Sequence, residues 1–108
     1  MVDAFDELKM KVNLFISGRN LKDLDSFSKS DPRCILYELR NNEWSEIGRT
    51  EVIMNNLNPD FTNSIKVDYY FEKVQKFKFT FIDEDNRDDF ETIGEVEVTM
   101  GKLMGASR

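Results

Sequence analysis

The strongest constraint on how this chain folds is a two-residue alternation of apolar and polar side chains along several short segments. Phe77, Phe79 and Phe81 alternate with Lys78 and Thr80, so a strand through them turns all three rings to one face. The same period runs through 11–17, 65–71 and 93–98, and mostly apolar strands are expected at 33–39 and 44–53. Stretches 3–9 and 100–105 show no sustained helical period of 3.6 residues, so the helical structure expected there is limited to short turns. The pattern predicts an all-β fold, an antiparallel β-sandwich.

The length of the chain suits one domain, and no internal repeat, linker or second unit interrupts it. Its 108 residues include nine phenylalanines, three tyrosines and one tryptophan, enough to fill a core that we expect within residues 11–104. Gly48 marks an expected bulge in the 44–53 strand. The net charge of −6 argues against a nucleic-acid-binding protein, because phosphate contacts need clustered lysine and arginine.

The residue types that are scarce exclude several kinds of chemistry. The chain has no histidine and one cysteine, Cys34, which rules out thiolate–imidazole zinc sites and His-based catalytic triads. The lone thiol, the absence of a signal peptide and the lack of a bilayer-spanning apolar run favour a cytoplasmic protein. Paired carboxylates also serve acid–base catalysis, but here they lie at predicted loop tips without a substrate pocket, so we expect no enzyme.

Acidic residues gather in two predicted loops that flank strands. Six acids lie between residues 83 and 91, among them Asp83 and Asp85, and the loop after the first strand holds Asp25 and Asp31. Calcium takes about six to eight oxygen ligands and favours carboxylates. If the two loops meet at one end of the sandwich, these four aspartates can share a calcium ion with an acid near position 89 or 91. The alternative is a pair of solvated acidic loops.

Family motifs are found in three stretches: LKDLDSFSKSDPRCILYEL, RTEVIMNNLNPDFTNSIKVDYYF and FKFTFIDEDN. Together they resemble a C2 domain, and most of all the first C2 domain of a copine, over roughly residues 11–104. The resemblance implies an eight-stranded antiparallel sandwich of C2 type. It also implies calcium bound between loops at one end, and docking of that end onto anionic phospholipid.

The resemblance assigns calcium ligands by position. The matching residues are Asp25 and Asp31 in the first loop and Asp83 and Asp85 in the third loop. Two residues compete for the fifth ligand. Asp89 is followed by Phe90, which gives the usual Asp-Phe pair of the family, whereas Glu91 has the usual spacing to Gly94.

The resemblance also implies that strands are missing. Six strands are visible, and the pattern stops near Thr99, where a C2 domain would continue with two more. We therefore expect residues 1–108 to be a single C2 domain lacking its last two strands, and a fragment of a larger copine-like protein. An unpaired sheet edge in such a chain would favour self-association.

Apolar residues at loop tips are the candidates for membrane contact. They are Phe27 in the first loop, Met54 in the second and Phe90 in the third, although Phe90 alternatively folds back onto the core. A basic patch is expected from Lys66, Lys76 and Lys78. This patch would bind a phosphoinositide or a protein partner, or be an ordinary solvated sheet face.

The sequence therefore predicts a calcium-dependent, phospholipid-binding module for signalling, recruited from the cytoplasm to the membrane when calcium rises. Calcium would turn the acidic loop end neutral or positive and leave coordination positions for lipid oxygens. The alternative is a calcium-independent C2 domain that serves as a protein–protein interaction scaffold. Convergence of the four loop aspartates distinguishes the two.

Overall fold

A computed structural model of the chain describes residues 8–23, 29–84 and 91–105, and these residues form six strands and one short helix. The elements are β1 (Lys9–Leu14), β2 (Pro32–Arg40), β3 (Glu43–Arg49), β4 (Ile65–Tyr70), β5 (Lys76–Asp83), β6 (Glu91–Thr99) and the helix α1 (Met100–Gly105). The predicted all-β fold is confirmed, as is the helical turn at 100–105. The other predicted turn, 3–9, falls mostly outside the described residues, and Lys9 belongs to β1 instead.

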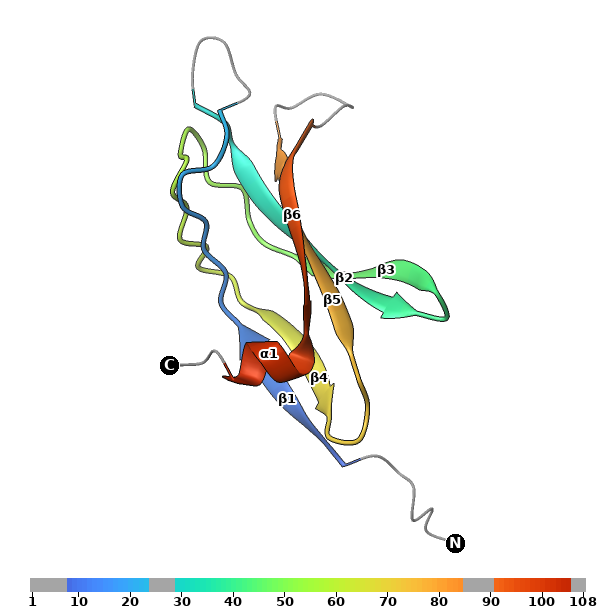
Figure 1. Ribbon diagram of the computed structural model, residues 1–108. Helices are drawn as coiled ribbons and strands as arrows, with labels where there is room; N and C mark the ends of the chain where they lie inside the picture. Colours follow the sequence, from blue (N-terminus) through green and yellow to red (C-terminus); the bar gives the residue numbers. More distant parts are fainter. Residues whose placement is uncertain (1–7, 24–28, 85–90, 106–108) are drawn as a thin grey trace, which may run out of the picture.

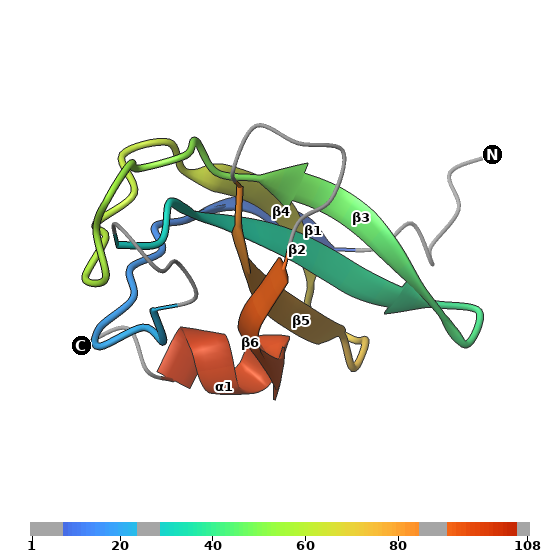
Figure 2. The ribbon, with the colours of Figure 1, turned by 90° about the horizontal axis from the view of Figure 1, so that it is seen from above.

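The strands form two antiparallel sheets of unequal size (Figure 1). One sheet has two strands, β1 and β4, and the other has four, in the order β3-β2-β5-β6. Seen from above, α1 and β6 lie on one side of the molecule and β1 and β4 on the other (Figure 2). The start of β2 and the end of β5 lie together, because Pro32 is paired with Asp83.

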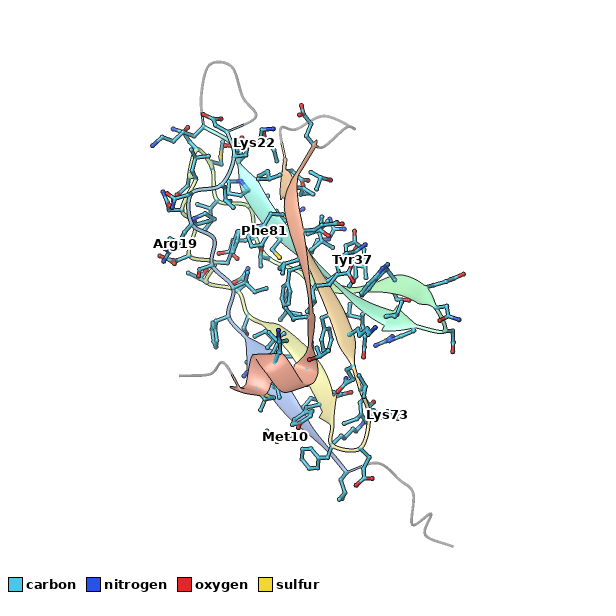
Figure 3. All side chains as sticks on the ribbon, viewed as in Figure 1. Met10, Arg19, Lys22, Tyr37, Lys73 and Phe81 are labelled. Carbon is cyan, nitrogen blue, oxygen red and sulfur yellow. The ribbon has the colours of Figure 1, made fainter. Side chains whose placement is uncertain are left out.

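The apolar alternation of the sequence becomes the core between the sheets. Phe77 and Phe79 are buried, and Phe81 is partly buried against the same cluster, directed between the two layers (Figure 3). The ring of Phe81 lies 6.2 Å from that of Phe61. The other sheet contributes Ile65 and Val67. The predicted aromatic stripe of β5 is therefore core, and the buried Cys34 also lies in this core as expected.

The hairpin between β2 and β3 follows from two features of its sequence. Asn41 and Asn42 both have positive φ, 51° and 64°, which asparagine tolerates and which a tight hairpin turn requires. Further along, the register shifts between Leu36, paired with Gly48, and Tyr37, paired with Glu46, so the expected bulge is present and its extra residue is Ile47, next to Gly48. A Cβ on Gly48 would meet Ile65 Cγ2 at 2.6 Å, so glycine is needed for the close approach of β3 and β4.

Two strand boundaries differ from the prediction. β1 ends at Leu14, and residues 16–21 continue as an irregular segment beside 57–61. There the Arg19 guanidinium donates to Asp60 Oδ1 at 2.6 Å and also reaches backbone carbonyls. β3 ends at Arg49 rather than residue 53. One isolated bridge, between Ser17 and Asp60, holds the first stretch. In the second stretch, the Thr50 N–H donates to the Cys34 carbonyl and the Ile53 N–H to the Pro32 carbonyl.

Gln75 joins the two sheets just before β5 begins. Its side chain is buried; Oε1 accepts the Tyr70 N–H at 3.0 Å, and Nε2 donates to the Asp68 carbonyl at 2.8 Å. Nε2 also donates to Glu38 Oε2 of β2 at 3.2 Å. Along a strand, the backbone groups of successive residues point to opposite edges. The Phe71 N–H donates to the Leu8 carbonyl just before β1, so the Tyr70 N–H and the Asp68 carbonyl face the other edge of β4.

Candidate metal centre and membrane-facing loops

Asp83 is the best-defined residue of the predicted calcium site. It ends β5 between β2 and β6, and only 3% of it is exposed. Its Oδ1 accepts the backbone N–H of Asp31 at 2.9 Å. Among the described residues, no lysine or arginine forms an ion pair with it. A buried carboxylate without a cation is costly, so this position favours a positive ligand.

Asp31 joins three segments at the same end of the sandwich. Its N–H donates to Asp83, and its carbonyl accepts the Glu84 N–H at 3.0 Å. Its Oδ1 accepts the Asn55 N–H at 2.6 Å. The first, second and third loops therefore meet at Asp31, and the structure brings together these two of the predicted metal ligands.

The donor atoms at this point suit a hard cation. Asp31 and Asp83 supply only carboxylate oxygens, and one oxygen of each is held by a backbone N–H, which leaves the other for coordination. Glu91 stands directly opposite Asp83 in the register of β5 and β6, so its side chain leaves the sheet on the same face. The carboxylate oxygens of Asp31 and Asp83 are ligands of the kind that calcium takes.

The remaining predicted ligands cannot be placed. Asp25, Asp85 and Asp89 fall in 24–28 and 85–90, outside the described residues. Within the described part of the chain, no three acidic, histidine or cysteine side chains form a metal-binding group. The choice between Asp89 and Glu91 for the fifth ligand stays a prediction.

Glu84, the neighbour of Asp83, forms an ion pair with an arginine, whereas no ion pair of Asp83 is found among the described residues. Arg33 NH1 lies 3.3 Å from Glu84 Oε1, and Arg33 Nε donates to the Thr50 carbonyl at 3.1 Å. Sequence reasoning missed this pair because Arg33 and Glu84 are 51 residues apart in the chain. The available signal was an arginine near the start of β2, two residues after Asp31.

The second loop, between β3 and β4, lies beside the predicted metal ligands Asp31 and Asp83. Met54 is 71% exposed and directly precedes Asn55, whose N–H binds Asp31. The loop is fixed further by the Lys29 N–H, which donates to Asn55 Oδ1, and by the Asn56 N–H, which donates to the Ser30 carbonyl. Met54 is thus at the same end as Asp31 and Asp83. Phe27 and Phe90, the other two predicted membrane contacts, fall outside the described residues.

The three lysines of the predicted basic patch come from two different sheets. Lys76 and Lys78 stand two residues apart on β5, and Lys66 is on β4 of the other sheet. The Lys78 ammonium lies 4.8 Å from the Trp44 ring and 5.2 Å from the Tyr37 ring, so it forms cation–π contacts. Sequence alternation places residues on a face, but it does not say which strands share a sheet.

The match to known families agrees with this geometry. The family model described as the C2 domain matches residues 9–108. The chain belongs to the C2 domain family. It is 42% identical over 101 residues to Copine-E of Dictyostelium discoideum, covering 87% of this chain. It is 43% identical over 95 residues to Nicotinic receptor-associated protein 1 of Caenorhabditis elegans, covering 72% of this chain. The predicted resemblance to copines is confirmed.

Solved structures show the same C2 fold at low sequence identity. BON1-C2B has a TM-score of 0.69 and 21% identity, covering 92% of this chain and 69% of that chain. The calcium-bound pair of C2 domains from Extended-Synaptotagmin 2 has a TM-score of 0.67 and 21% identity, and the match covers 90% of this chain and 36% of that chain. Human GIVD cytosolic phospholipase A2 has a TM-score of 0.69 and 17% identity, and the match covers 87% of this chain and 13% of the phospholipase chain.

The C2 chain spans only a small part of its curated relatives, 17% of Copine-E and 15% of Nicotinic receptor-associated protein 1. No helix among the described residues is long and apolar enough to cross a membrane.

Proposed function

We propose that this C2 domain is a calcium-dependent module that binds anionic phospholipid, and that it works by binding rather than by catalysis. The observation that carries the proposal is the hydrogen bond from Asp31 to the buried carboxylate of Asp83. It joins two acidic loops at a point where the described residues supply Asp83 with no ion-pair partner. A divalent cation would supply the missing positive charge.

The residues proposed to hold calcium are Asp31 and Asp83, with Asp25, Asp85 and either Asp89 or Glu91. Calcium, when bound, supplies positive charge and coordination positions for lipid phosphate or carboxylate oxygens. Asp31 and Asp83 then hold the ends of the first and third loops together. Met54 projects from the second loop at the same end, where an exposed apolar side chain can enter the lipid interface.

Two findings support this proposal beyond the site itself. The relatives with more than 40% identity include Copine-E, and one of the solved C2 structures of the same fold is described as calcium bound. We further propose that the domain is cytoplasmic and reaches the membrane as a peripheral partner when calcium rises, within a larger copine-like protein.

Calorimetric titration with calcium, followed by vesicle sedimentation, tests the proposal. The vesicles are phosphatidylcholine with and without phosphatidylserine, in calcium or in chelator. We expect calcium binding in solution, and sedimentation only with phosphatidylserine and calcium together. Equal sedimentation in chelator would show calcium-independent lipid binding, and neither calcium nor vesicle binding would favour the protein-scaffold alternative.

A further inference from the structure

We propose that Asn55 is a positioning residue of the calcium site, through which the second loop fixes the first-loop ligand Asp31. The inference rests on the proposed function. Asn55 is not itself a ligand in this proposal. It acts on the backbone that leads to Asp31 and on the Asp31 carboxylate.

Three hydrogen bonds define this role. The Asn55 side-chain Oδ1 accepts the Lys29 N–H at 2.7 Å, and the Asn55 backbone N–H donates to Asp31 Oδ1 at 2.6 Å. Next to them, the Asn56 N–H donates to the Ser30 carbonyl at 3.0 Å. Residues 29–31 are therefore held along their length by two consecutive residues of the second loop.

The asparagine side chain suits this position for two separate reasons. Asn55 has a φ of 56°, in the left-handed region that only glycine, asparagine and aspartate adopt readily. Glycine would satisfy the backbone but has no oxygen to accept the Lys29 N–H. Only asparagine and aspartate combine the backbone conformation with an acceptor at this distance.

The consequence is a direct link between metal binding and membrane contact. Met54 is the residue before Asn55, and its side chain is exposed. A peptide bond and one short hydrogen bond connect Met54 to the carboxylate of Asp31. Fixing Asp31 around a cation therefore also fixes the backbone that presents Met54.

The first test replaces only the acceptor. Asn55→Gly preserves the positive φ and the N–H to Asp31 but removes the oxygen that binds Lys29. Groups that orient metal ligands typically change affinity by about 10–100-fold, so we expect calcium binding to weaken about ten-fold by calorimetry. The matched control is Asn42→Gly, the same substitution at a φ of 64° in the β2–β3 turn, which should leave calcium affinity unchanged.

The melting temperature in chelator separates positioning from folding. We expect Asn55→Gly to melt within the range of the wild type and Asn42→Gly when calcium is absent. If Asn55→Gly instead has a lower melting temperature in chelator, the calcium affinity of Asn55→Asp is the deciding measurement, because aspartate restores the acceptor oxygen. Recovery of calcium affinity that persists in about 1 M potassium chloride supports the proposal, since high salt screens the added charge.

Two results would overturn the inference. One is wild-type calcium affinity in Asn55→Gly, and the other is an Asn55→Asp variant that recovers affinity only at low salt or not at all. A wild-type protein that binds no calcium would overturn the proposed function as well. That case is distinguishable, because the failure then appears before any variant is compared.

Discussion

Asp68 and Asp83 are two carboxylates on different sheets whose charges the protein treats in opposite ways. Asp68, on β4, lies 2.9 Å from the Lys11 ammonium and 3.9 Å from that of Lys9. The hydrogen bond from Lys11 lowers the pKa of Asp68 and raises the pKa of Lys11. Asp83, at the end of β5, is more buried, yet it receives one backbone N–H and no ion pair from the described residues.

The difference is between a charge that is balanced within the chain and one that calcium would balance in the proposed function. Asp68 has a register partner, Lys11, placed opposite it by the β1–β4 ladder, so its charge is balanced within the chain. Glu84 shows that the chain can supply a cation near Asp83 too, because Arg33 pairs with Glu84. Arg33 therefore balances Glu84, and no ion-pair partner of Asp83 is found among the described residues.

The largest expected effect comes from Asp83→Asn. At calcium concentrations about 100 times the dissociation constant, the wild type should gain about 2.7 kcal/mol of unfolding free energy through binding. The variant should gain none, because a neutral amide is a poor calcium ligand. Thermal unfolding in calcium and in chelator measures both values.

Asp68→Asn is the control for that experiment. It should preserve the calcium-dependent gain while lowering stability in chelator, because Lys11 loses its partner. Asp83→Asn should not lower stability in chelator, since the amide oxygen can still accept the Asp31 N–H. A calcium response that survives in Asp83→Asn would end the distinction between the two aspartates.

Met54→Ala should have the next largest effect, on membrane binding rather than metal binding. Burial of a methionine side chain is worth about 1.5 kcal/mol or more, so vesicle affinity should fall about ten-fold or more. Sedimentation with phosphatidylserine vesicles in calcium measures this loss.

Val74→Ala provides the comparison, because Val74 is 84% exposed but lies in the turn between β4 and β5, near Lys73 at the opposite end (Figure 3). It should leave vesicle binding unchanged. If both substitutions weaken binding equally, the lipid contact is not confined to the loop end.

The smallest effect is the pH dependence of the Asp68 pair. Because the folded-state pKa of Asp68 is lowered, its contribution is present above the unfolded value of about 3.9 and is lost as the pH falls below it. The raised pKa of Lys11 sets the other limit, with stability lost as the pH rises above 10.5. Urea midpoints of the wild type and Asp68→Asn should converge at both extremes. A constant difference across pH would show that the pair does not carry the effect.

The sequence predicts the elements of this fold better than their partners. The β5 aromatic stripe and the bulge at Gly48 depend on neighbouring residues, so local pattern predicts them. Sheet membership does not follow from local pattern: Lys66 and Lys78, predicted for one patch, lie on strands of different sheets. In the site, the resemblance predicts Asp31 and Asp83 as ligands, yet no local pattern predicts the hydrogen bond between these residues, which are 52 positions apart.

Asn55 was missed for a related reason. The second loop contains Asn55, Asn56 and Asn58, and the sequence does not tell which of them contacts the first loop. The fold places Asn55 against Lys29 and Asp31. A positive φ at a non-glycine residue is visible in the structure but not in the sequence.

The Gln75 amide has a consequence for how the smaller sheet can grow. Its oxygen and nitrogen bind the Tyr70 N–H and the Asp68 carbonyl in the way that the peptide group of an adjacent strand would. An additional strand that paired with this end of β4 would have to displace the buried Gln75 side chain, which also donates a hydrogen bond to Glu38 of β2. At this end of the smaller sheet Gln75 covers the edge of β4, whereas β1 pairs with no second strand among the described residues, so an added strand would be directed to β1.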